Sequence, residues 1–184
     1  MPEAKFETLF RNELEDLQDA ERQILEALPK MIEAASSEEL ASAFQEHLEQ
    51  TKEQVKRLER IFSDMGEEPG GKTCLGMQGL LKEGEKVIGE MEKSPVRDAG
   101  LIAAAQKVEH YEISGYGTAR TLAEMLGQDE AAELLEETLD EEKATDDTLT
   151  DIAESIMTGE TNEEVEDIEE DEEIDEDEEE EVGR

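Results

Sequence analysis

The chain has 184 residues and carries 55 acidic against 17 basic side chains, a net charge of −38 at neutral pH. A surface of this sign repels a phosphate backbone, which excludes direct binding of nucleic acid. Aromatic residues make up only 3% of the chain, so a strand-rich sandwich is disfavoured. No apolar run approaches the roughly 20 residues that cross a bilayer, and the single cysteine, Cys74, fits a reducing compartment. We therefore expect a cytoplasmic protein without a membrane anchor.

The C-terminal end is the most acidic part of the chain. Residues 160–184 hold 17 acidic side chains and one basic one, and they have too little apolar surface to offset the entropy of ordering. We expect a helical bundle over residues 1–158 and a disordered acidic tail over residues 159–184, available for contact with other proteins.

The bundle itself is also strongly acidic, with few basic residues between the acids. Its self-repulsion would fade at molar salt, where the screening length is about 3 Å. This predicts adaptation to a salt-rich cytoplasm. An acidic surface in an ordinary cell is the alternative interpretation.

Apolar residues at helical spacing predict a first long helix over residues 3–34. The next residues match a capping box, with Ser36 as the N-cap and Glu39 three positions later, and they predict a second helix that ends near Gly66. Because the turn between these helices is short, we expect them to be antiparallel neighbours.

A glycine-rich break separates this hairpin from a shorter amphipathic stretch, roughly residues 75–92. Ser94 and Pro95 then match the N-cap and first residue of a third long helix, and Gly127 is suited to end it. Asp129 is the expected N-cap of a fourth long helix, which runs to about residue 157.

Two helical hairpins joined by one long crossover define the predicted fold. The crossover contains a short extra helix, and the whole is all-α. This arrangement predicts a ferritin-like four-helix bundle followed by the acidic tail.

Each long helix carries polar residues in the middle of its apolar stripe. In the first, third and fourth long helices these are Glu21, Glu109, Glu112, Glu142 and Asp146. In the second long helix they are His47, Gln50, Thr51 and Gln54. Because the middles of antiparallel helices lie at one level, we expect these side chains to meet inside the bundle.

Carboxylates that are buried together cost several kcal/mol per ion unless they are protonated or bind cations. The stripes contain no lysine or arginine, so two metal ions bridged by carboxylates are one solution. A plain bundle with solvated acids is the other. A rival stripe on the third long helix, which includes Leu101 and Val108, would turn Glu109 and Glu112 toward water.

Several segments around these acids are distinctive. They are AERQ (20–23), ALPKM (27–31), HLEQT (47–51), AAAQKVEHYEI (103–113) and EETLDEEKATD (136–146). Over residues 5–155 the sequence resembles the YciE/YciF family of ferritin-like stress proteins. The resemblance implies a homodimer, a role in the stress response, and a dinuclear iron or manganese centre with ferroxidase or oxidase-like activity.

The resemblance also implies the ligands of that centre. They are Glu21, Glu109, Glu112 and Glu142, and Gln50 and Asp146 complete the candidate set. Gln50 stands where the family typically has Glu, and a neutral amide binds hard cations less well. The rival hypothesis is therefore a metal-free dimeric bundle that acts as a structural or interaction protein in stress.

Three further residues near the candidate ligands have plainer interpretations. We expect His47 to pack between helices with its hydrogen bonds satisfied, although it could also be a ligand. His110 should be interfacial or exposed. Tyr116 should pack in the core with a partner for its hydroxyl.

Overall fold

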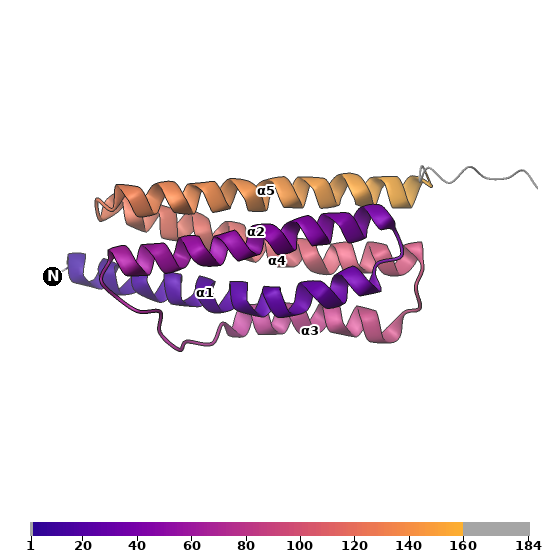
Figure 1. Cartoon of the computed structure of the whole chain (residues 1–184), viewed down its shortest axis with the longest axis horizontal. Helices are drawn as coiled ribbons and strands as arrows, with labels where there is room; N and C mark the ends of the chain where they lie inside the picture. The colour runs from indigo at the N-terminus through magenta and orange to yellow at the C-terminus, as the bar shows by residue number, and fades with distance from the viewer. Residues whose placement is uncertain (1, 160–184) are drawn as a thin grey trace, which may run out of the picture.

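The computed structural model describes residues 2–159, which form five helices arranged side by side along one axis (Figure 1). The long helices are α1 (Pro2–Ala34), α2 (Glu38–Asp64), α4 (Pro95–Met125) and α5 (Asp129–Thr158), and the short one is α3 (Leu75–Glu90). The described part of the chain contains no strand. Apart from Gly159, the predicted acidic tail lies outside the described residues.

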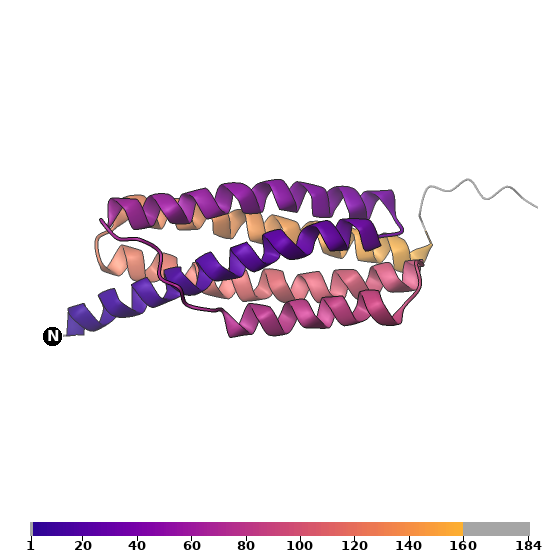
Figure 2. The ribbon, with the colours of Figure 1, turned by 60° about the horizontal axis from the view of Figure 1, so that its bottom comes forward.

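The four long helices form a closed bundle. α1 packs on α2, α4 packs on α5, and the two hairpins meet through contacts of α1 with α4 and of α2 with α5. The crossover from α2 to α4 contains α3, which lies along the outside against α1 and α4 (Figure 2). The prediction of an all-α, ferritin-like bundle with a helix in its crossover is confirmed.

The position of α3 settles the choice between the two stripes of α4. Leu101 and Val108 are buried, but so are Glu109 and Glu112, because α4 has α5, α1 and α3 as neighbours. The rival stripe therefore does not turn the acids toward water. It packs against α3 instead.

The start of α3 is also tied to α4. The buried thiol of Cys74 caps the helix by accepting from the amide of Met77. The same sulfur lies 3.0 Å from the hydroxyl of Tyr111. Sequence analysis anticipated neither contact.

The core consists of two apolar clusters, one toward each end of the bundle. One contains Ile24, Leu28, Leu40, Phe44, Leu101, Val108, Leu149 and Ile152 among others. The other contains Phe10, Leu14, Leu17, Leu58, Phe62, Tyr116, Leu135 and Leu139 among others. On each long helix the clusters occupy different stretches, and the polar residues noted in the sequence fall between them.

The N-cap of α2 differs from the prediction by one residue. Ser37, not Ser36, accepts a hydrogen bond from the amide of Leu40 (3.4 Å). The cause is tertiary: the carboxylate of Asp98, at the start of α4, accepts from the backbone amides of both Ser36 and Ser37, each at 2.8 Å. This contact fixes the turn so that the helix begins at Glu38.

The other helix ends agree with the sequence except at α5. Ser94 caps α4, and Gly127 ends it with a φ of +68°, a conformation that favours glycine. The predicted N-cap Asp129 is wrong, because Asp129 is the first residue of α5 and no side chain caps that helix. Gln128 takes the N-cap position of α5. Its backbone amide donates a hydrogen bond to the carbonyl of Ala123 (2.9 Å) at the end of α4.

None of the helices within residues 2–159 is both long and apolar enough to span a membrane.

Candidate metal centre

Four buried side chains from three helices meet between the two apolar clusters. They are His47 from α2, Glu109 and Glu112 from α4, and Glu142 from α5. Each offers one potential ligand atom, and these atoms all lie within 4.8 Å of one another. We call this group the four-residue cluster. Glu109 and Glu112 are three positions apart, which places them on the same face of α4.

His47 lies between two of the carboxylates. Its Nδ1 is 3.3 Å from Oε1 of Glu109, and its Nε2 is 3.8 Å from Oε2 of Glu142. Within residues 2–159 the Nε2 atom has no hydrogen-bond partner, and the same is true of both oxygens of Glu109, both of Glu112 and one of Glu142. Buried polar atoms are normally paired, so this concentration of unpaired atoms marks the cluster as a candidate ligand site.

Glu21 of α1 adds a fourth buried acid beside the cluster. Its Oε1 accepts a hydrogen bond from the hydroxyl of Tyr116, and its Oε2 has no partner. Its charge contributes to the raised pKa of Glu112, so the two acids are neighbours. Tyr116 is fully buried, and its hydroxyl is satisfied by a site carboxylate.

Burial and mutual repulsion disfavour the ionised acids. Desolvation first, and then the charge of Glu142, raise the pKa of Glu21, Glu109 and Glu112 well above the usual value for glutamate. Burial raises the pKa of Glu142 itself to about 7, against the effect of a hydrogen bond from Gln54. A cation that displaced the protons would relieve this cost.

Burial has the opposite consequence for the imidazole. Loss of solvation lowers the pKa of His47 to about 4. His47 is therefore neutral at physiological pH, which is the form that binds metals.

Besides Glu21, two other candidate ligands are not members of the four-residue cluster. Gln50 is half-buried, and its side-chain oxygen accepts a hydrogen bond from Thr145 (3.4 Å). Asp146 accepts from Gln106 (3.1 Å) and lies 3.4 Å from Nε2 of the exposed His110. Both residues are thus engaged where α5 meets its neighbouring helices.

Comparison with known proteins identifies the family. Protein YciF of Escherichia coli (strain K12) is 51% identical over 148 residues, which cover 80% of this chain and 89% of that protein. The chain belongs to the YciF family. Residues 5–165 match the family described as Domain of unknown function (DUF892).

Solved structures agree with the YciF fold. The crystal structure of the E. coli stress protein YciF superposes with a TM-score of 0.81 at 48% identity and covers 83% of this chain and 97% of its own. A protein from Rhodopseudomonas palustris, described as a putative structural protein, has a TM-score of 0.76 at 43% identity and covers 79% and 92%. A protein from Xanthomonas campestris pv. campestris, 17% identical with a TM-score of 0.67 and coverage of 84% and 94%, shares the fold.

The sequence-based expectations for this family member underrated two residues of α2. His47 lacks the satisfied hydrogen bonds that we expected, and Gln54 rather than Gln50 is the amide that reaches the cluster. A periodic signal was available in the sequence. The buried face of α2 runs through Phe44, His47, Thr51, Gln54 and Leu58, a spacing of three and four residues that omits Gln50.

The donor set suits a transition metal. One neutral imidazole and several carboxylates are typical ligands of iron and manganese, and the unpaired carboxylate oxygens are available as ligand atoms. The residues of this YciF-family bundle therefore fit a metal centre chemically.

Proposed function

We propose that the chain binds two iron or manganese ions between its four long helices and acts as a ferroxidase or oxidase-like protein. One observation carries the proposal: His47, Glu109, Glu112 and Glu142 converge in the buried four-residue cluster with most of their polar atoms unpaired. Within residues 2–159, no lysine or arginine forms an ion pair with these acids. Multivalent cations would supply the missing positive charge.

Each residue would have a definite part in holding the ions. Glu21, Glu109, Glu112 and Glu142 would provide carboxylate oxygens, and His47 would provide a neutral nitrogen. Tyr116 would orient Glu21, and Gln54 would orient Glu142, through the hydrogen bonds that they donate. Bound ions of this kind supply Lewis acidity and one-electron redox chemistry.

The cellular setting is part of the proposal. A role in the stress response is supported by the relative described as the E. coli stress protein YciF. We further propose a cytoplasmic homodimer adapted to high salt, in line with the net charge of −38.

A metal-free bundle with a structural role is the second candidate. Two observations favour it: the R. palustris relative is described as a putative structural protein, and the residue of α2 that hydrogen-bonds Glu142 is the neutral Gln54. Such a protein would keep its acids protonated and act through dimerisation or partner binding.

Metal content separates the two candidates. The full chain is purified without chelator in molar KCl and titrated anaerobically with Fe(II) or Mn(II). We expect two ions per chain and a higher unfolding temperature, since a ligand that binds the folded state stabilises it. Fewer than one ion per chain, with an unchanged unfolding temperature, would favour the structural role.

A pair of variants tests the site directly. Glu112→Gln replaces one buried ionisable carboxyl of the four-residue cluster by an amide. It should weaken metal binding and stabilise the metal-free protein, because the cost of holding that carboxyl protonated is removed. Glu133→Gln, at an exposed position on α5, makes the same chemical change and should alter neither property. Equal metal affinity in both variants would remove the cluster from consideration.

A further inference from the structure

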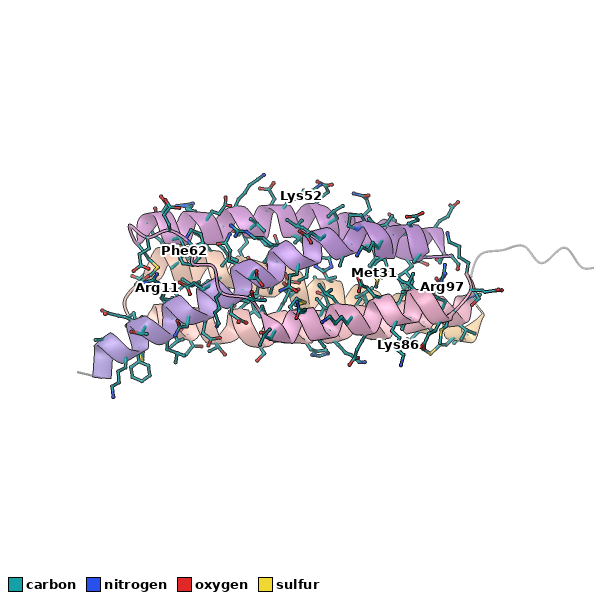
Figure 3. All side chains as sticks on the ribbon, turned by 90° about the horizontal axis from the view of Figure 1, so that it is seen from below. Arg11, Met31, Lys52, Phe62, Lys86 and Arg97 are labelled. Carbon is teal, nitrogen blue, oxygen red and sulfur yellow. The ribbon has the colours of Figure 1, made fainter. Side chains whose placement is uncertain are left out.

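A small pocket connects the surface of the bundle with the four-residue cluster. Its volume is about 40 Å³, and residues of α1, α2, α3 and α4 line it. Most of the wall is aliphatic and includes Leu28, Met31, Leu81 and Ile88. Met31, labelled in Figure 3, belongs to the stretch of α1 that runs alongside α3.

The two ends of the pocket are chemically different. Lys30 and Glu85, which form an exposed ion pair at 2.9 Å, line it on the outside. His47 and Glu109 line it on the inside, and they are 3% and 0% exposed. The pocket therefore extends from an exposed ion pair to two buried residues of the cluster, His47 and Glu109.

Size and polarity limit what the pocket can hold. A volume of about 40 Å³ is far below the roughly 150 Å³ of a cavity that binds benzene, so an aromatic ring or an alkyl chain does not fit. A hydrated ion would lose its water shell against an aliphatic wall at a large cost. Water and hydrogen peroxide need two or more polar partners, and apart from Lys30, Glu85, His47 and Glu109 the lining of the pocket is apolar.

We propose that this pocket binds dioxygen and admits it to the metal centre. A small, uncharged and apolar diatomic molecule meets all three limits. Admission of dioxygen to the metal centre rests on the proposed function, because it assumes that metal ions occupy the cluster. Since Leu81, Gly84 and Ile88 come from α3, the crossover helix would have a purpose beyond connecting the hairpins: it builds the outer wall of the passage.

Binding is measured on the full chain stripped of metal, with methyl-labelled isoleucine, leucine, valine and methionine. Xenon is the first probe, and dissolved dioxygen, which is paramagnetic, is the second. We expect saturable xenon shifts and strong dioxygen broadening at Leu28, Leu81 and Ile88. Leu14 and Leu135, buried in the other apolar cluster, are the reference. Effects on the pocket methyls no larger than on this reference would overturn the proposal.

Glycine residues of α3 offer a matched pair of variants. A Cβ at Gly84 would lie 3.7 Å from Cβ of Ala104 and 3.8 Å from Sδ of Met31, which is ordinary contact. Gly84→Val should therefore fill the pocket and abolish the saturable xenon shifts. Gly79→Val changes an exposed position of the same helix, where a Cβ has no neighbour within 4 Å, and should keep them. Gly84→Ala, a smaller change, should weaken xenon binding without displacing α3.

The outcomes distinguish the pocket from the metal centre. Xenon binding in a protein that takes up no metal would leave the pocket in place and overturn the proposed function. Metal binding without a xenon effect would support the proposed function and overturn the proposed dioxygen pocket. If the protein binds both metal and xenon, Gly84→Val should bind Fe(II) like the parent chain. Dioxygen should then oxidise the Fe(II) bound to this variant more slowly. Unchanged oxidation by dioxygen in that variant would show that the pocket is not the route.

Discussion

The side-chain nitrogen of Gln54 donates a 2.5 Å hydrogen bond to Oε1 of Glu142. Both residues are buried, and the contact joins α2 to α5 at the level of the four-residue cluster. Gln54 also donates to Glu141 (3.1 Å), which is held from outside by Arg57 (2.6 Å). One oxygen of Glu142 is therefore fixed by the protein, and the other faces the cluster without a partner.

The Gln54→Leu variant should weaken both metal binding and folding. Without the amide, Oε1 of Glu142 loses its buried donor, which costs about 1–3 kcal/mol of unfolding free energy. Loss of the group that orients a ligand typically lowers metal affinity about 10- to 100-fold. Urea unfolding and metal titration measure the two effects.

Gln50→Leu is the control for this change. Its side-chain oxygen accepts a long hydrogen bond of 3.4 Å from Thr145, at a half-buried position. We expect a small loss of stability and unchanged metal affinity. If Gln50→Leu weakened metal binding as much as Gln54→Leu, the assignment of Gln54 as the orienting residue would be wrong.

The metal-free protein should become less stable as the pH rises from about 4.5 through 7. Glu142 has its pKa raised to about 7 in the folded state, and burial also raises the pKa values of Glu21, Glu109 and Glu112 well above normal. The folded state therefore holds protons that the unfolded state has released, and stability falls over this range.

His47 opposes this trend, since its pKa is lowered to about 4 and its neutral form favours folding as the pH rises through 6.5. Because four acids lower the stability as the pH rises and one histidine raises it, we expect a net loss of stability. Chemical unfolding of chelated protein at a series of pH values measures the slope. Glu142→Gln should reduce the slope, whereas the exposed Glu133→Gln should not, and equal slopes would contradict the link to the cluster.

The helices and their order could be predicted because each long helix has a regular apolar stripe and recognisable ends. The two wrong N-caps had tertiary or neighbouring causes that a local motif does not contain. Asp98, more than 60 positions along the chain, selects Ser37 over Ser36. The backbone amide of Gln128 hydrogen-bonds to the end of α4, so Gln128 takes the N-cap position and Asp129 lies inside α5.

The candidate site was predictable in part for a similar reason. Four of the buried acids interrupt apolar stripes and could be found from periodicity. The sequence left open whether Glu109 and Glu112 face inward, because α4 has a second apolar stripe. Only the position of α3, which packs on α4, shows that both stripes can be buried. The polar interruption of α2 contained both Gln50 and Gln54, and the family resemblance favoured Gln50, whereas the buried face of α2 passes through Gln54.

Asp98→Ala should destabilise the bundle by about 2–4 kcal/mol. The carboxylate of Asp98 is 1% exposed and accepts from two backbone amides, those of Ser36 and Ser37. Its removal leaves both donors without a partner, each costing about 1–3 kcal/mol. Asp129→Ala, at a residue that caps no helix, should change the unfolding free energy by about 0.5 kcal/mol or less. A similar loss in both variants would refute the role of Asp98.

Unfolding by urea should require a higher midpoint concentration in molar KCl than in dilute buffer. The net charge of −38 makes the compact state repel itself, and salt screens that repulsion. A double variant, Glu46→Lys with Glu154→Lys, lowers the negative charge at two exposed positions. It should raise the midpoint in dilute buffer and leave it unchanged in molar KCl, because screened charges no longer interact at these distances. A midpoint of the parent chain that stays constant from low to molar salt would exclude salt adaptation.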